Sequence, residues 1–124
     1  MKLYGTVKEH EICVPIFDQY FYVLFGKENW NRLCVEEPEL KDFIGDGSFG
    51  LVAHHLEHNR LYLYFEEDVE NDRGTLPHEL YHLALRICDA RGIKQKDEEL
   101  IAHLLGYLYA QVKPLFKDHI KKEL

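Results

Sequence analysis

The chain has few of the residues that build cross-linked or extended structures. Its 124 residues include only 3 Cys, 4 Pro and 8 Gly. Three widely spaced cysteines without a Cys-x-x-Cys pair exclude a disulfide framework and a thiolate zinc site. The low Pro and Gly content and the lack of repeats exclude collagen-like and low-complexity chains. We therefore expect one domain over residues 1–124, in which the cysteines act as small buried hydrophobic residues.

Long apolar runs and positive charge are also scarce. The longest apolar runs, at residues 12–17 and 20–25, are far shorter than the roughly 20 residues of a membrane helix, and the N-terminus lacks a signal pattern. Fifteen Lys and Arg against 22 Asp and Glu give a net charge of -7, which disfavours contact with a phosphate backbone. We expect a soluble, cytoplasmic protein that binds neither nucleic acid nor membrane. The sequence gives no indication of oligomeric state.

The first half of the chain is rich in β-branched and aromatic residues, which favour strands. The pattern predicts strands at residues 2–7, 12–17 and 20–25, one or two short helices over residues 28–43, and a β-hairpin over residues 48–65. Together with two helices in the second half, these elements predict an α+β fold. We expect a small twisted sheet followed by two packed helices.

The second half carries clear helix signals. The first helix is expected to start at an N-cap, Thr75, and to run to Ala90, because Gly92 is a typical C-terminal stop. The second is expected to start after an N-cap at Asp97 and to kink or end at Pro114, because proline lacks a backbone donor.

The first helix contains the motif His-Glu-x-x-His, formed by His78, Glu79 and His82. Two histidines four residues apart lie on one helix face, one turn apart, so their imidazoles can bind one zinc ion. Glu79 lies to the side of that face, where its carboxylate can act as a general base toward a water on the metal. The alternative is that both histidines are ordinary surface residues of an amphipathic helix.

A catalytic zinc usually has a third protein ligand. The second helix offers Glu98, Glu99 and His103. Small residues at four-residue spacing form a stripe on this helix that permits close approach of another helix, and Glu99 lies nearest the centre of the stripe. We therefore predict Glu99 as the third ligand and His103 as a group that orients a ligand or adds a further donor. The alternative is that both glutamates complement the helix dipole. The stripe consists of Ala102, Gly106 and Ala110.

Residues 74–82 resemble the start of the metal-binding helix of zincin metallopeptidases, in the gluzincin-type branch where a later helix supplies a glutamate ligand. Residues 97–108 resemble a helix of small phage and prophage proteins, in which Glu-x-x-Ala-Tyr-Leu-x-Gly-Tyr-Leu follows the HExxH-type helix. The resemblance covers the second half well and the first half loosely. His103 departs from it, because those proteins more often have Tyr there.

This resemblance implies a minimal zincin-like domain in which His78, His82 and Glu99 bind Zn²⁺ and Glu79 is the catalytic base. The implied function is hydrolysis of a peptide or protein substrate by a metallopeptidase of phage or prophage origin. The alternative is a binding or regulatory protein with a structural metal site or none, since function depends on the site and not on the fold.

A hydrolytic site also needs a donor for the developing oxyanion and a surface for the substrate. The hairpin histidines are donor candidates, but their simpler interpretation is a solvated loop. One hairpin strand could pair with an extended substrate, although it equally fits an ordinary core strand. The donor candidates are Tyr81, His103, Tyr107, His54, His55 and His58.

Overall fold

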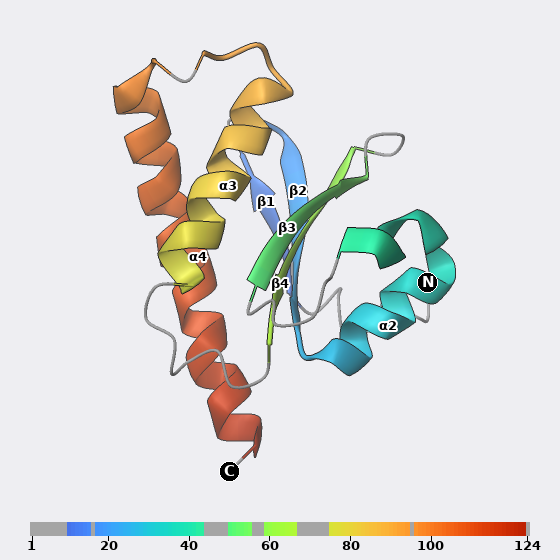
Figure 1. Ribbon diagram of the computed structural model, residues 1–124. Helices are drawn as coiled ribbons and strands as arrows, with labels where there is room; N and C mark the ends of the chain where they lie inside the picture. Colours follow the sequence, from blue (N-terminus) through green and yellow to red (C-terminus); the bar gives the residue numbers. More distant parts are fainter. Residues whose placement is uncertain are drawn as a thin grey trace.

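The structure of the chain is a computed structural model (Figure 1), which describes residues 10–15, 17–43, 50–55, 59–66, 75–94 and 96–123. The elements follow in the order β1 (Glu11–Val14), β2 (Gln19–Phe25), α2 (Lys27–Glu36), the 3-10 helix η1 (Pro38–Phe43), β3 (Gly50–His55), β4 (Arg60–Phe65), α3 (Thr75–Asp89) and α4 (Glu98–Glu123).

The four strands form one mixed sheet in the order β1-β2-β4-β3. The central strands β2 and β4 are parallel, and each carries an antiparallel partner on its outer side. Helix α2 covers one face of the sheet, and α3 and α4 cover the other (Figure 1). The α+β fold, the hairpin and the two short helices are therefore confirmed. The strand predicted at residues 2–7 lies outside the described residues.

The central strands are buried on both faces, which explains their nearly continuous apolar sequence. In β4, Leu61, Leu63 and Phe65 contact the core under α3 and α4. Tyr62 and Tyr64, on the opposite face, pack with Trp30 and Leu33 of α2 and with other residues of that second core. The sheet therefore separates two hydrophobic cores.

Helices α3 and α4 form an antiparallel hairpin (Figure 1). Gly92 has a φ of 70° in the connection, and the N–H of Ile93 donates to the carbonyl of Cys88 at 3.0 Å, a typical helix stop. The carboxylate of Asp97 accepts a hydrogen bond of 3.4 Å from the N–H of Leu100 and caps α4. The ends predicted for both helices around this turn are confirmed.

Helix α4 does not end at Pro114 but continues to Glu123. Proline removes one intrahelical hydrogen bond, that to the carbonyl of Ala110. Beyond it, the ring of Phe116 packs edge-on against Phe25 and Phe65, with centroids 5.1 and 4.8 Å apart. This aromatic packing stabilises the helix past the proline.

Within the described residues, Cys13, Cys34 and Cys88 form no disulfide. Cys88 is buried and Cys13 and Cys34 are half-buried, so the prediction of small buried residues holds fully for Cys88. In the part of the chain that the structure describes, no helix has both the length and the apolar character needed to span a bilayer.

Candidate functional site

The two histidines of the HExxH motif lie side by side on an exposed face of α3. Their Nε2 atoms are 3.2 Å apart, and the ring centroids are 4.7 Å apart at an interplanar angle of 74°. The side chain of His78 is 66% exposed. The four-residue spacing thus gives the shared face that the sequence predicted.

The separation of these two nitrogens suits a zinc ion. Two imidazole nitrogens about 2.0 to 2.1 Å from one tetrahedral ion are roughly 3.3 Å apart. The same separation also permits a hydrogen bond in which one neutral ring donates to the other. The distance between the two nitrogens would therefore allow both imidazoles to bind one Zn²⁺ ion.

Glu79 is buried beside this pair, with only 7% of the residue exposed. Its Oε2 lies 3.9 Å from the Nε2 of His78. Burial raises the pKa of the Glu79 carboxyl, while the two neighbouring histidines oppose the shift. A carboxylate in such surroundings is a better proton acceptor than one in water.

The first turn of α3 packs closely on β3, an edge strand of the sheet. A Cβ atom on Gly50 would lie 2.9 Å from Cγ2 of Thr75 and 3.0 Å from Cγ of Glu79. Only glycine permits this approach without displacing a neighbour. Gly50 thereby sets the position of Glu79 next to the sheet edge.

The structure does not bring Glu99 to the two histidines. The small-residue stripe of α4 is exposed, so it is not the face of α4 that packs against α3. The side chain of Glu99 is 88% exposed, and its Oε2 lies 3.4 Å from the Nε2 of His103, which is also exposed. The face of α4 that packs into the core consists of Ile101, Leu104, Leu108 and Val112.

Glu99 and the HExxH motif also lie at different positions along the axis of the helix hairpin. His82 lies seven residues before the end of α3, whereas Glu99 is the second residue of the antiparallel α4. Seven residues of helix span about 10 Å. Among the described residues, no group of three or more His, Cys, Asp or Glu side chains could hold a metal ion.

Of the predicted oxyanion donors, only Tyr81 lies on α3, and it is 47% exposed. The hydroxyl of Tyr107 instead donates to the carbonyl of Cys13 at 3.1 Å and joins α4 to β1. The Nε2 of His54 forms a 3.0 Å hydrogen bond with the side chain of Asn59. His58 lies outside the described residues.

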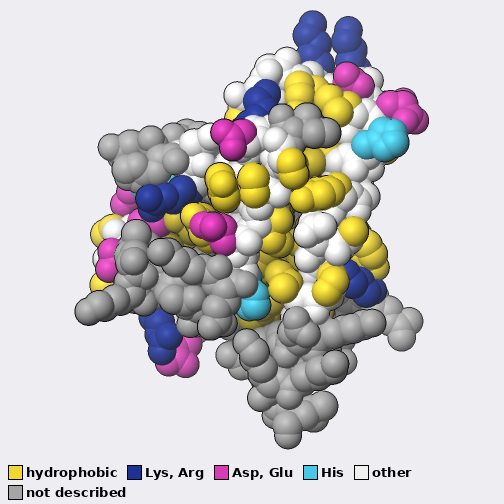
Figure 2. All heavy atoms as spheres, turned by 180° about the vertical axis from the view of Figure 1, so that it is seen from behind, with side chains coloured by type: hydrophobic (Ala, Val, Ile, Leu, Met, Phe, Trp, Pro, Cys, Tyr) yellow, Lys and Arg dark blue, Asp and Glu magenta, His cyan; other side chains and the backbone are white. Residues whose placement is uncertain are grey.

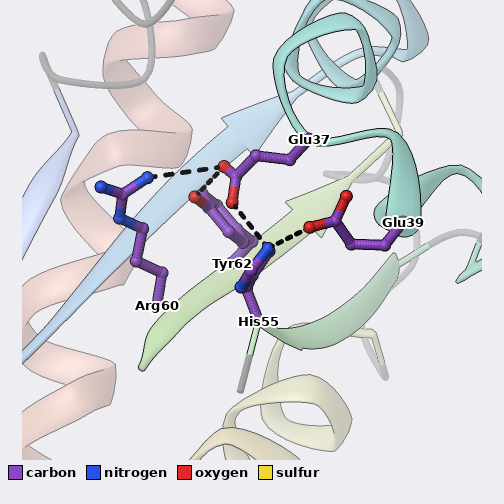
Figure 3. Close-up of polar contacts among 5 residues, drawn as sticks. All are labelled: Glu37, Glu39, His55, Arg60 and Tyr62. Carbon is purple, nitrogen blue, oxygen red and sulfur yellow. Dashed lines mark hydrogen bonds and ion pairs between the residues drawn. The ribbon is translucent and has the colours of Figure 1, made fainter. Parts of the chain in front are cut away.

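A second cluster of polar residues lies on the opposite side of the sheet (Figure 3). The Nε2 of His55 hydrogen-bonds to Glu39 and lies 3.5 Å from Oε1 of Glu37. The hydroxyl of Tyr62 donates to Oε2 of Glu37 at 2.5 Å, and Nη1 of Arg60 lies 3.9 Å from the same oxygen. The cluster connects the residues that follow α2 to strands β3 and β4.

Sequence reasoning missed this cluster. From the sequence, His55 is either a candidate oxyanion donor or part of a solvated loop. The loop interpretation is wrong, because β3 extends through His55 and its side chain is only 3% exposed. The alternation of a strand places His55 and Ala53 on the same face, which is a signal for burial. No sequence pattern identifies Glu37 as its neighbour. Burial and the hydrogen bond to Glu37 raise the pKa of Tyr62 well above its ordinary value. We assign the cluster to holding α2 and η1 on the sheet.

Comparison of the chain with protein-family models, with curated proteins and with solved structures finds no match. The function is therefore inferred from the geometry of the chain's own residues.

Proposed function

We propose that the protein is a zinc-dependent hydrolase, most simply a peptidase, in which His78 and His82 bind the metal and Glu79 is the general base. The observation that carries the proposal is the position of a buried carboxylate beside two exposed imidazoles whose Nε2 atoms are 3.2 Å apart. A bound Zn²⁺ would supply a Lewis acid that polarises the scissile carbonyl and acidifies water.

The residues of the chain then divide the remaining tasks. The two imidazoles hold the ion at the surface of α3, where a substrate can reach it. Glu79 accepts the proton of the attacking water and returns it to the leaving amine. Its burial against Gly50 keeps the carboxylate partly dehydrated, which strengthens it as a base.

The edge strand β3 supports a peptide as the substrate. Among the described strands, β3 pairs only with β4, so its outer edge carries backbone donors and acceptors. An extended peptide can add to such an edge as a further strand. Because Gly50 at the start of β3 contacts Glu79, a peptide on this edge would pass close to the base. This juxtaposition of an HExxH helix with an edge strand supports the zincin-like interpretation.

We do not include Glu99 in the proposed site, because the helix hairpin keeps it about 10 Å from the motif along the axis. We expect Glu99→Ala to keep its zinc. Loss of zinc in that variant would instead favour the ligand role that the resemblance implies.

The proposal is tested by the zinc content of protein purified without a histidine tag or chelator. We expect zinc in the wild type and its loss in both His78→Ala and His82→Ala. His103→Ala is the matched control, because His103 is also an exposed histidine, lies on the neighbouring helix and should not change the zinc content. Zinc that persists in both motif variants would refute the metal site.

Catalysis is tested separately with Glu79→Gln, which keeps the size of the side chain and removes the base. We expect this variant to retain zinc and to lose roughly 10² to 10⁴-fold in the rate of peptide hydrolysis. Unchanged hydrolysis would show that Glu79 is not the base. Bound zinc without hydrolysis of any peptide in the wild type would favour the non-catalytic alternative.

A further inference from the structure

The outer face of α4 has no partner within the described residues, and it does not belong to the proposed site. Its residues lie within roughly 60° of Gly106 around the helix and are all exposed. This outer face consists of Glu99, Ala102, His103, Gly106, Tyr109, Ala110 and Lys113.

Gly106, at the centre of this face, contacts no other element in the described part of the chain that would require glycine. A Cβ atom placed there would meet nothing within 4 Å. Glycine in the middle of a helix destabilises it relative to alanine, so the position is unfavourable for the isolated chain. What glycine permits is close approach of another backbone, and Ala102 and Ala110 on either side extend this low surface by one turn in each direction.

The two ends of the outer face carry opposite charges. At one end, Oε2 of Glu99 lies 3.4 Å from Nε2 of His103. At the other, Nζ of Lys113 donates to the hydroxyl of Tyr109 at 2.9 Å and lies over its ring. Figure 2 shows this side of the molecule, with acidic and histidine side chains at the upper right and a basic side chain lower on the same edge.

The arrangement is symmetric about Gly106. Glu99 and Lys113 each lie seven residues from it, and His103 and Tyr109 each lie three residues from it. A face of this kind is complementary to itself when it is turned end for end. The charges of Glu99 and Lys113 also cancel, so the face is neutral on a chain whose net charge is -7.

We propose that two copies of this chain associate through the outer face, with their α4 helices antiparallel about a two-fold axis at Gly106. Glu99 of each copy then faces Lys113 of the partner subunit, and the Ala102 and Ala110 side chains pack across the axis. A parallel pair would bring two Glu99 carboxylates together, which the repulsion of like charges disfavours. The proposal does not depend on zinc or on hydrolysis.

The test is sedimentation of the full chain over a range of concentrations, with charge reversals at the two ends of the face. We expect the wild type to dimerise, and Glu99→Lys and Lys113→Glu each to weaken the dimer by roughly tenfold or more, since each reversal places two pairs of like charges in contact. The double variant restores opposite charges and the net charge of the wild type. It should dimerise as the wild type does.

Two further variants separate this surface from general effects. Glu98→Lys makes the same charge change in the same first turn, but Glu98 lies about 80° from the centre of the face, so it should leave the dimer intact. Gly106→Leu favours the helix and should abolish the dimer, because the larger side chain holds the backbones apart. Circular dichroism checks that each variant is folded.

Three results would overturn the proposal. These are a wild type that is monomeric at every concentration, a double variant no better than the single ones, and equal weakening by Glu98→Lys and Glu99→Lys. Chelation of zinc should not change the association, so failure of the dimer and failure of the metal site are measured independently.

Discussion

Two of the glutamate–histidine contacts in the described part of the chain, at His55 and at the HExxH motif, differ in which side chain is buried. At His55 the imidazole and the Glu37 carboxylate are both more than nine-tenths buried and lie 3.5 Å apart. The Glu37 carboxylate also contacts Tyr62 and Arg60. At the HExxH motif the imidazoles are exposed and only Glu79 is buried. Buried groups that satisfy one another hold a fold together, whereas exposed donors beside a buried base can bind and react.

Strand β3 serves both places. The odd-numbered residues of β3, such as Ala53 and His55, face the core under α2, while the even-numbered Gly50 and Val52 face α3. The hydrogen bonds of His55 fix one end of the strand, and the contact of Gly50 with Glu79 lies at the other. Substitutions along and around β3 therefore distinguish the structural cluster from the candidate metal site.

The largest effect is expected for Glu37→Ala. It removes the acceptor for the Tyr62 hydroxyl and the neighbour of His55, and leaves both buried. Removing one partner of a buried ionic cluster destabilises a protein by about 3 to 5 kcal/mol. Urea denaturation measures the change. Glu36→Ala, at the adjacent, exposed last residue of α2, should change stability by less than about 0.5 kcal/mol. Equal losses in the two variants would contradict the structural role.

A smaller loss is expected for Gly50→Ala. The new Cβ would clash with Thr75 and Glu79, and overpacking of this kind costs about 1 to 3 kcal/mol. Gly106→Ala is the control at a protein concentration where the chain is monomeric. A Cβ there meets no described atom within 4 Å, so this change should stabilise the chain by roughly 0.5 to 1 kcal/mol. If Gly50→Ala is neutral in thermal denaturation, the close contact of α3 with β3 is wrong.

Alkaline pH should weaken the structural cluster. The pKa of Tyr62 is raised from its ordinary value of 10.0 by burial and by Glu37, so above about pH 10 the unfolded chain loses a proton that the folded chain keeps. The free energy of unfolding therefore falls with rising pH, by at most about 1.4 kcal/mol per pH unit for this residue, and the stability is fully present below pH 10. Tyr62→Phe should reduce the slope of stability against pH. Tyr81→Phe, at an exposed tyrosine, should leave it unchanged, and equal slopes in all three proteins would exclude this origin.

The smallest effect is expected for His78→Ala in the presence of a chelator. Its imidazole is exposed, so we expect a change of less than about 0.5 kcal/mol. His55→Ala should cost several times more, because its side chain is buried. With zinc added, the melting temperature should rise in the wild type and not in His78→Ala. If His78→Ala is strongly destabilised without zinc, the motif stabilises the fold, as the cluster at His55 does, and is not primarily a metal site.

Local signals in the sequence predicted most of the elements, while contacts between distant elements were harder to predict. Gly92 and Asp97 determine helix ends through their own backbone and side-chain geometry, so they could be identified from the chain alone. The parallel pairing of β2 with β4 has no such signal, since the residues between them form other elements.

The orientation of α4 shows how two sequence signals can conflict. One side of the helix is rich in Leu and Ile, and the other carries the small-residue stripe around Gly106. Burial of Ile101, Leu104 and Leu108 outweighed close approach on the stripe, because removing their apolar area from water stabilises the fold more. Glu99 therefore lies on the exposed side of α4. Its angular position around the helix also gave no information on its position along the helix axis.

The parallel central pair also sets the order in which the chain can assemble. The hairpins β1–β2, β3–β4 and α3–α4 join segments that are close in sequence, whereas Phe21 pairs with Leu61, forty residues later. Closing that loop carries an entropic cost before any contact in the central ladder forms, so we expect it to limit the folding rate. During synthesis on the ribosome, β2 emerges before β4 and cannot yet pair with it. Until β4 is available, the apolar side chains of β2 must be shielded from water by other contacts.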